Sequence, residues 1–174
     1  SNKFFIKSCK KIFCYSNEIK NFPNKLKNKI SVIPSLLRKE FYLNNQTTSI
    51  NKDVKLLIIG GSQGAKLFDT AIQNSIIDLS KKYKLKIYQQ SSQNNYQSLK
   101  KFYQINEINN ELFDFNEEIS IFMKKSNICL TRAGASTLAE LVFLNIPHIA
   151  IPLPTAKDNH QFENAFFYNQ HGCN

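Results

Sequence analysis

Two short glycine-containing segments hold the residues with the clearest potential for ligand chemistry. One reads Gly-Gly-Ser-Gln-Gly-Ala over residues 60–65, and the other reads Thr-Arg-Ala-Gly-Ala over residues 131–135. Each follows an apolar run and precedes a helical pattern. The chain has five glycines, and four of them lie in these two segments. Because N–H groups at a helix start attract anions, and glycine lets a ligand approach the backbone, we predict phosphate binding at both turns.

The first segment differs from the common nucleotide-binding motifs. It lacks the G-x-G-x-x-G pattern of dinucleotide-binding folds, and it has no Gly-Lys-Ser/Thr at the spacing of a P-loop. It does offer a helix start at which the hydroxyl or N–H group of Ser62 could donate to a diphosphate oxygen. A plain tight turn capped by Ser62 is the alternative, but that turn would account for one glycine rather than three.

Gly134 and residues 135–137 open the helix that follows the second segment, and Glu140 lies one turn further along. A carboxylate at that position can accept hydrogen bonds from two vicinal hydroxyls, as on a ribose. Glutamate near a helix start also serves commonly as a capping or solvated residue. Taken alone, Glu140 fits that second role better.

Arg38 and Arg132 are the only arginines among 23 basic residues. Arginine binds phosphate through a rigid fork that lysine lacks, so two arginines in a lysine-rich chain suggest a geometric need. Both arginines are expected beside the edge of the fold where the ligand would bind. With only two residues, chance is the open alternative.

Residues 158–161, Asp-Asn-His-Gln, follow a proline-containing loop and begin a helix, and their side chains suit hydroxyl recognition. Taken alone, His160 is more typical of a helix-start or surface histidine than of a catalytic base. No Ser/His/Asp relay stands out. The four cysteines lie far apart without a C-x-x-C pair, so we predict no metal site and no cofactor.

Strand-like and helical patterns alternate from residue 54 onwards, which predicts an α/β fold with a parallel sheet. In such sheets ligands bind at the carboxyl ends of the strands, where both glycine turns lie. The expected strands cover 54–59, 85–88, 112–115, 128–131 and 148–151. The expected helices cover 67–79, 91–102, 117–124, 137–144 and 161–170. Upstream we expect a helix over 3–15, or a helix followed by a strand at 11–15, then a strand at 30–33 and a polar linker over 42–52.

The composition favours an anionic partner. The formal net charge is +10 and the hydrophobic content is 42%, which is enough for a packed core. A lysine-rich compositional bias is the alternative explanation of the charge. No aromatic-interleaved basic stripe is present, so we predict no nucleic-acid partner. No apolar run is long enough to span a membrane. The chain begins with Ser-Asn and ends at a helix cap, so we expect a fragment clipped at both ends.

Three motifs together resemble the MurG family of bacterial N-acetylglucosaminyltransferases. They are Gly-Gly-Ser-Gln-Gly-Ala at 60–65, Thr-Arg-Ala-Gly-Ala-Ser-Thr-Leu-Ala-Glu at 131–140, and Pro-Leu-Pro-Thr-Ala-Lys-Asp-Asn-His-Gln-Phe-Glu-Asn-Ala at 152–165. The resemblance runs from about residue 30 to the end. It implies a GT-B glycosyltransferase fold, with residues 46–174 as the UDP-sugar donor domain, truncated at its C-terminus. Residues 1–45 would be the end of the acceptor domain and the interdomain linker.

The resemblance also implies a set of residues around UDP-N-acetylglucosamine (UDP-GlcNAc). It assigns the diphosphate to Arg38, Ser62 and Gln63, together with the backbone of Gly60, Gly61 and Gly64. It assigns the uracil to Phe115 and Asn116, and the ribose to Glu140. The sugar is assigned to Asp158, Asn159, His160 and Gln161.

The implied reaction is an inverting, metal-independent transfer of N-acetylglucosamine to lipid I, which forms lipid II in peptidoglycan synthesis. The catalytic base stays unassigned and would lie in the family's N-terminal domain, so this chain alone is expected to be inactive. The implied partners are UDP-GlcNAc, lipid I through that domain, and the cytoplasmic face of the inner membrane, where the protein would be peripheral. Residues 3–13, basic and aromatic, are expected either to touch lipid or to be a buried helix. The alternatives are another GT-B UDP-sugar transferase, or a non-enzymatic nucleotide- or RNA-binding module.

Overall fold

The computed structural model describes residues 5–17, 19, 22–42, 53–60, 67–115, 119–156 and 159–173. It divides the chain into two compact units, Ser1–Leu36 and Leu37–Asn174. The expected boundary at residue 45 lies further along the chain than this division. The assignment of the two parts to an acceptor domain and a donor domain stays a prediction.

The first unit contains a small parallel sheet. Its strands are β1 (Ile12–Cys14) and β2 (Ile30–Val32), with Ile12 opposite Ile30. A 3-10 helix, η2 (Asn24–Lys29), leads into β2, and the ammonium group of Lys29 donates to the carbonyls of Lys7 and Cys9 at 2.9 and 2.8 Å. The structure thus has a strand within 11–15 and another within 30–33, as expected. The described residues before β1 form turns rather than a helix.

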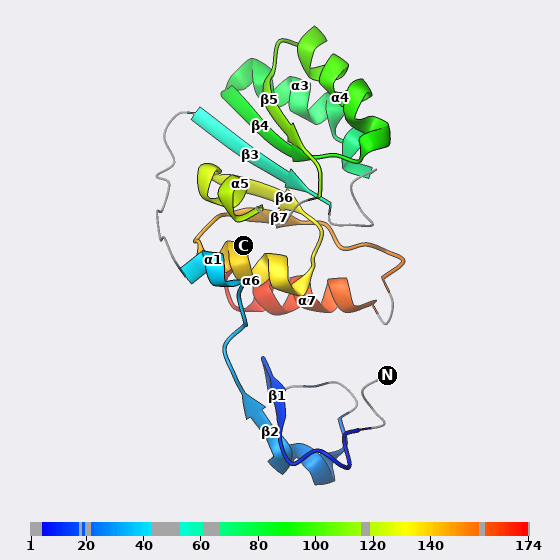
Figure 1. Ribbon diagram of the computed structural model, residues 1–174, viewed down its shortest axis with the longest axis vertical. Helices are drawn as coiled ribbons and strands as arrows, with labels where there is room; N and C mark the ends of the chain where they lie inside the picture. The colour runs from blue at the N-terminus through cyan, green and yellow to red at the C-terminus, as the bar shows by residue number, and fades with distance from the viewer. Residues whose placement is uncertain are drawn as a thin grey trace. The chain divides into compact units, whose positions relative to one another are not determined.

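The second unit is built on a five-stranded parallel sheet with the order β5-β4-β3-β6-β7 (Figure 1). The strands are β3 (Asp53–Ile59), β4 (Lys84–Gln90), β5 (Asn109–Phe113), β6 (Ile128–Thr131) and β7 (His148–Ala150). In chain order this is the 3-2-1-4-5 arrangement of doubly wound folds, whose order reverses between β3 and β6. The predicted α/β class is confirmed, and the two glycine turns follow the two strands at the reversal.

Helices cover both faces of this sheet (Figure 1). One face carries α3 (Gln73–Lys82) and α4 (Gln93–Ile105). The opposite face carries α1 (Lys39–Tyr42), α5 (Ile119–Lys125) and α6 (Ala135–Phe143), and α7 (His160–Gln170) lies against α6.

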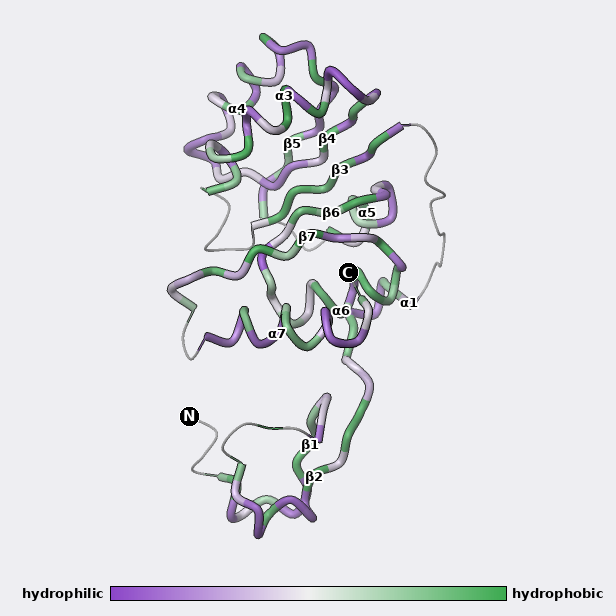
Figure 2. The backbone as a smooth tube through the Cα atoms, turned by 180° about the vertical axis from the view of Figure 1, so that it is seen from behind, coloured by the Kyte–Doolittle hydropathy of each residue, from purple (hydrophilic) through white to green (hydrophobic). Residues whose placement is uncertain are grey.

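The central strand β3 explains why the sheet needs two covering layers. Leu57 and Ile59 belong to the core on the α5 and α6 side, whereas Leu56 and Ile58 belong to the core on the α3 and α4 side. Alternate side chains of a strand point to opposite faces, so a continuous apolar run is buried on both. Figure 2 shows hydrophobic residues along most of β3 and β6 in the middle of the sheet.

Several element boundaries differ from the expectations. The helix expected over 67–79 is broken by a turn at residues 71–72, and α3 begins only at Gln73. Strand β5 begins at Asn109 rather than at residue 112, because backbone pairing with β4 recruits polar residues that disfavour strands. The short helix α1 was not expected, and its Phe41 is fully buried in the core. Most of the linker expected over 42–52 lies outside the described residues.

Candidate functional site

The carboxyl ends of β3 and β6 adjoin at the centre of the sheet, where Ile59 pairs with Thr131. Gly60, directly after β3, is buried. The remainder of the first turn lies outside the described residues, and with it the predicted diphosphate contacts Gly61, Ser62, Gln63 and Gly64.

The second turn is described in full and ends in an uncapped helix start. The N–H of Arg132 donates to the carbonyl of Ile59 at 3.3 Å, which joins the turn to β3. Gly134 is the N-cap of α6, and no side chain among the described residues caps the helix. The first intrahelical bond runs from Leu138 N–H to Gly134 O at 3.0 Å. The amides of residues 135–137 therefore face out of the helix end, where an anion can accept from them.

Nothing in the described fold demands glycine at position 134. Its φ is −72°, an ordinary value for any residue. A Cβ placed there would meet the hydroxyl of Thr137 at 3.7 Å, which is a normal contact. The reason for a glycine here would then be the space that it leaves for a ligand at the helix start.

Glu140 lies on α6 with its carboxylate almost fully buried, at 3% side-chain exposure. Arg38 pairs with it through two parallel bonds, from Nε to Oε1 at 2.8 Å and from Nη2 to Oε2 at 2.9 Å. The structure therefore brings together two predicted site residues, but as partners of one another. Glu140 therefore neither caps the helix nor faces solvent, which are the two common roles of a glutamate near a helix start.

Arg132 is 7% exposed and bonds to backbone carbonyls. Its Nη1 donates to the carbonyls of Ile151 and Pro152 at 3.2 and 3.3 Å, and its Cζ lies 5.0 Å from the centre of the Phe68 ring. Its Nε is buried without a hydrogen-bond partner among the described residues. Burial lowers the pKa of this guanidinium. Arg132 thus joins the second turn to the end of β7 and to the helical residues after the first turn.

The start of α7 is anchored to the same edge. The Oε1 atom of Gln161 accepts from the N–H of Leu153 at 2.8 Å, and Nδ2 of Asn164 donates to the carbonyl of Ala133 at 3.0 Å. Asn159 has a left-handed conformation with φ of 53°, and His160 is the exposed first residue of the helix. Asp158 lies outside the described residues.

Phe115 follows β5 at the same end of the sheet and is 67% exposed. Its N–H donates to Oδ1 of Asp114 at 2.7 Å, in a local turn. Asn116, the other residue expected at uracil, lies outside the described residues.

The sequence patterns gave no expectation of a buried polar network around Asp69. Asp69 is 2% exposed and accepts from Gln89 Nε2 at 3.0 Å and from Asn95 Nδ2 at 2.6 Å. The Tyr103 hydroxyl donates to Gln89 Oε1. Burial raises the pKa of Asp69, although these hydrogen bonds oppose the change. The available signal was an aspartate at the apolar face of a helical pattern, directly after Phe68.

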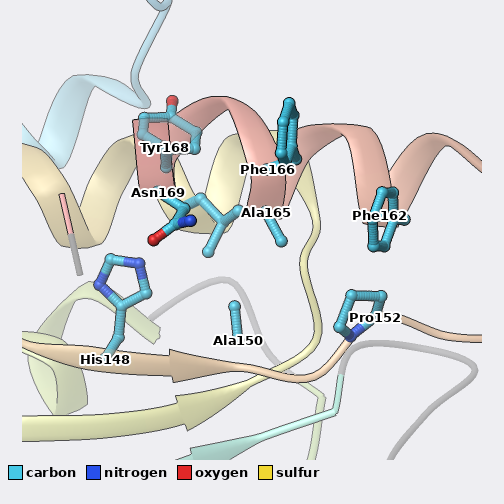
Figure 3. Close-up of a pocket in the computed structure, with 9 residues that line it drawn as sticks. His148, Ala150, Pro152, Phe162, Ala165, Phe166, Tyr168 and Asn169 are labelled. Carbon is cyan, nitrogen blue, oxygen red and sulfur yellow. The ribbon is translucent and has the colours of Figure 1, made fainter. Parts of the chain in front are cut away.

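A cavity of about 290 Å³ lies beside the edge strand β7, between it and α7 (Figure 3). Figure 3 shows His148 and Ala150 on the strand side and Ala165 and Asn169 on the helix side. None of the predicted ligand residues that the structure describes lines it. Among the described residues there is no group of three or more potential metal ligands, and no helix is long and apolar enough to cross a membrane.

Comparisons with known proteins agree with this fold. The family model "Glycosyltransferase family 28 C-terminal domain" matches residues 55–174. The UDP-N-acetylglucosamine--N-acetylmuramyl-(pentapeptide) pyrophosphoryl-undecaprenol N-acetylglucosamine transferase of Pelagibacter ubique (strain HTCC1062) is 61% identical over 174 residues, which are 100% of this chain and 49% of the relative. The transferase of the same name from Rickettsia canadensis (strain McKiel) is 40% identical, over 94% of this chain and 48% of the relative.

The crystal structure of Acinetobacter baumannii MurG matches with a TM-score of 0.60 at 27% identity, covering 70% of this chain and 35% of that chain. The resemblance to MurG and the GT-B type of fold, with its Rossmann-like sheet, are thereby confirmed. The chain spans about half the length of the curated relatives it matches. The chain belongs to glycosyltransferase family 28, with residues 55–174 matching the C-terminal domain of that family.

Proposed function

We propose that this chain is the donor-binding half of an N-acetylglucosaminyltransferase, which transfers N-acetylglucosamine from UDP-GlcNAc to lipid I and so forms lipid II. The observation that carries the proposal is the buried carboxylate of Glu140 on the helix whose uncapped start lies at the strand-order reversal. The names of the relatives, which describe this transfer, support the choice of donor and acceptor.

The spacing along α6 suits a nucleoside diphosphate. Glu140 is five residues after Ala135, so the two Cα atoms are separated by about 7.5 Å along the helix axis. Helical side chains lean towards the N-terminus, which brings the carboxylate closer to the free amides. A ribose at Glu140 would then place its phosphates near the amides of residues 135–137.

The remaining donor contacts follow the predicted assignment. Ser62 and Gln63 would hold the diphosphate from the first turn, and Phe115 and Asn116 would flank the uracil. The N-acetylglucosamine would lie against residues 158–161. Because Oε1 of Gln161 already accepts a backbone bond, Gln161 would meet the sugar through its Nε2 donors.

The proposed reaction is a direct displacement with inversion. The acceptor hydroxyl oxygen of lipid I bonds to the anomeric carbon, the bond from that carbon to the UDP oxygen breaks, and the proton goes to a base in the other half of the enzyme. Amides at the start of α6 and nearby positive charge stabilise the leaving UDP, so the proposed transfer is metal-independent. The chain alone would bind the donor weakly without turnover.

We further propose a peripheral location on the cytoplasmic face of the inner membrane, since lipid I is a lipid. Lysines and exposed aromatic residues gather at the start of the chain, including Phe5 and Phe13. Such residues suit an anionic lipid surface.

Calorimetric titration of the chain with UDP-GlcNAc, UDP-glucose, ADP-glucose and NADH tests the donor assignment. We expect selective binding of UDP-GlcNAc that Glu140→Gln weakens. Glu111→Gln is the matched control, because Glu111 lies on the far edge strand β5 beside Lys125. Preferential binding of UDP-glucose would favour a different UDP-sugar transferase. Tight binding of NADH or ADP-glucose would overturn the proposal.

A further inference from the structure

The pairing of Arg38 with Glu140 changes what each residue can do for a ligand. The two residues are 102 positions apart and meet through two charge-assisted hydrogen bonds of 2.8 and 2.9 Å. This is the fork geometry in which arginine matches a carboxylate best. Glu140 is buried, whereas the Arg38 side chain is 39% exposed. Removal of Arg38 would leave the buried carboxylate without this charge compensation, which is costly.

The guanidinium is also held from its other side. Its Cζ lies 5.2 Å from the centre of the Phe41 ring, and Phe41 is fully buried in the core. Lys124 of α5 donates to the carbonyl of Glu40 at 2.9 Å and so ties α1 to α5. The direction of Arg38 towards Glu140 is therefore set by packing as well as by charge.

The fork uses only part of the hydrogen-bonding capacity of the Glu140 carboxylate. An ionised carboxylate offers about four lone-pair sites, and the fork uses one on each oxygen. One site on each oxygen remains, which matches the two hydroxyls of a ribose. Arg38 can therefore stay bound to Glu140 while Glu140 accepts from a diol.

We propose that Arg38 is a positioning residue that acts on ribose recognition through Glu140, in place of the diphosphate contact expected from the sequence. This inference rests on the proposed nucleotide-sugar function. It makes residues 37–42, which open the second unit, part of the ribose site. The phosphates are then bound by the amides at the start of α6 and by the first turn instead of by Arg38.

A ligand series separates the two roles of Arg38. Uridine, 2′-deoxyuridine and UDP are titrated into the full chain and into Arg38→Gln, with chemical-shift changes as the readout for weak ligands. If Arg38 acts through Glu140, Arg38→Gln weakens uridine and UDP by the same factor, about tenfold for a lost charge-assisted contact. The preference for uridine over 2′-deoxyuridine should then shrink. An unchanged affinity for uridine with a loss for UDP would overturn the inference.

A double-mutant cycle provides the second arm. In a Glu140→Gln background, the added Arg38→Gln substitution should not change the affinity for uridine further, because the carboxylate through which Arg38 acts has been removed. Equal effects in both backgrounds would contradict the inference. Arg38→Lys retains the charge without the fork, and it replaces Arg38→Gln if that variant does not fold. Failure of the unsubstituted chain to bind UDP would overturn the proposed function itself, and the inference with it.

Discussion

Glu140 and Asp69 are both buried carboxylates near the carboxyl end of the sheet, but their partners differ. Glu140 faces the charged fork of Arg38, which is partly exposed. Asp69, on the other face of the sheet, is held by the amide groups of Gln89 and Asn95. Neutral donors of the interior enclose the Asp69 carboxylate, whereas the Glu140 carboxylate pairs with a charged side chain that reaches the surface. We therefore expect Asp69 to determine stability and Glu140 to determine binding.

The largest effect on stability is expected from Asp69→Ala. The substitution removes the acceptor of two buried amide donors and leaves a cavity, which should lower the free energy of unfolding by about 3 kcal/mol. Urea unfolding measures it. Asp78→Ala is the matched control, because Asp78 is exposed on α3 beside Lys81 and should change stability by less than about 0.5 kcal/mol. Equal losses in the two variants would contradict the importance of the network.

Arg132→Lys should have a smaller effect, about 1–2 kcal/mol. Lysine keeps a positive charge but cannot place one guanidinium against two carbonyls and the Phe68 ring at once. Hydrogen exchange of the Ile151 and Leu153 amides should accelerate, because Arg132 no longer holds the end of β7. If exchange there is unchanged while residues elsewhere become less protected, Arg132 does not anchor this loop.

The pH dependence of stability should report the burial of the Asp69 carboxyl group. Burial raises the pKa of Asp69 in the folded chain, so its ionisation disfavours folding. Relative to Asp69→Asn, the unsubstituted chain should be most stable below about pH 4, the pKa of an unperturbed aspartate, and should lose that advantage as pH rises through the folded pKa. Urea unfolding of both proteins across this range measures the difference. A stability advantage of the unsubstituted chain over Asp69→Asn that grew with rising pH would contradict a raised pKa of Asp69.

The smallest effect on stability is expected from Gly134→Ala. The φ value and the free space at Gly134 both accept a methyl group, so the free energy of unfolding should change by less than about 0.5 kcal/mol. The affinity for UDP should fall, because the methyl group occupies space at the start of α6. Unchanged UDP affinity, measured by calorimetry, would place the phosphates elsewhere.

The part of the fold predicted from the sequence is the part governed by local pattern. Strand β6 forms at residues 128–131 as expected, and β3 at 53–59 differs by one residue, because continuous apolar runs identify buried strands. Strand β5 was misplaced because its polar residues gain strand structure only by pairing with β4. The short helix α1 depends on the burial of Phe41, a tertiary contact that its four residues do not reveal.

The sequence singles out candidate site residues, but it does not indicate which of them contact one another. Arg38 and Glu140 were both singled out, yet nothing in a single sequence indicates that residues 102 positions apart share two hydrogen bonds. Arg132 was expected at a phosphate, and its bonds to the carbonyls of Ile151 and Pro152 depend on where β7 ends. The Asp69 network likewise joins side chains from three elements.

The most direct test compares the affinity of UDP-GlcNAc for Glu140→Gln and for Asp69→Asn by calorimetry, at a temperature where both variants are folded. We predict that Glu140→Gln weakens binding about tenfold or more, since it removes a charged acceptor for the ribose hydroxyls, while Asp69→Asn changes the affinity by less than about twofold. An unchanged affinity in Glu140→Gln, or an equal loss in both variants, would contradict the claim that Glu140 is the residue that holds the nucleotide.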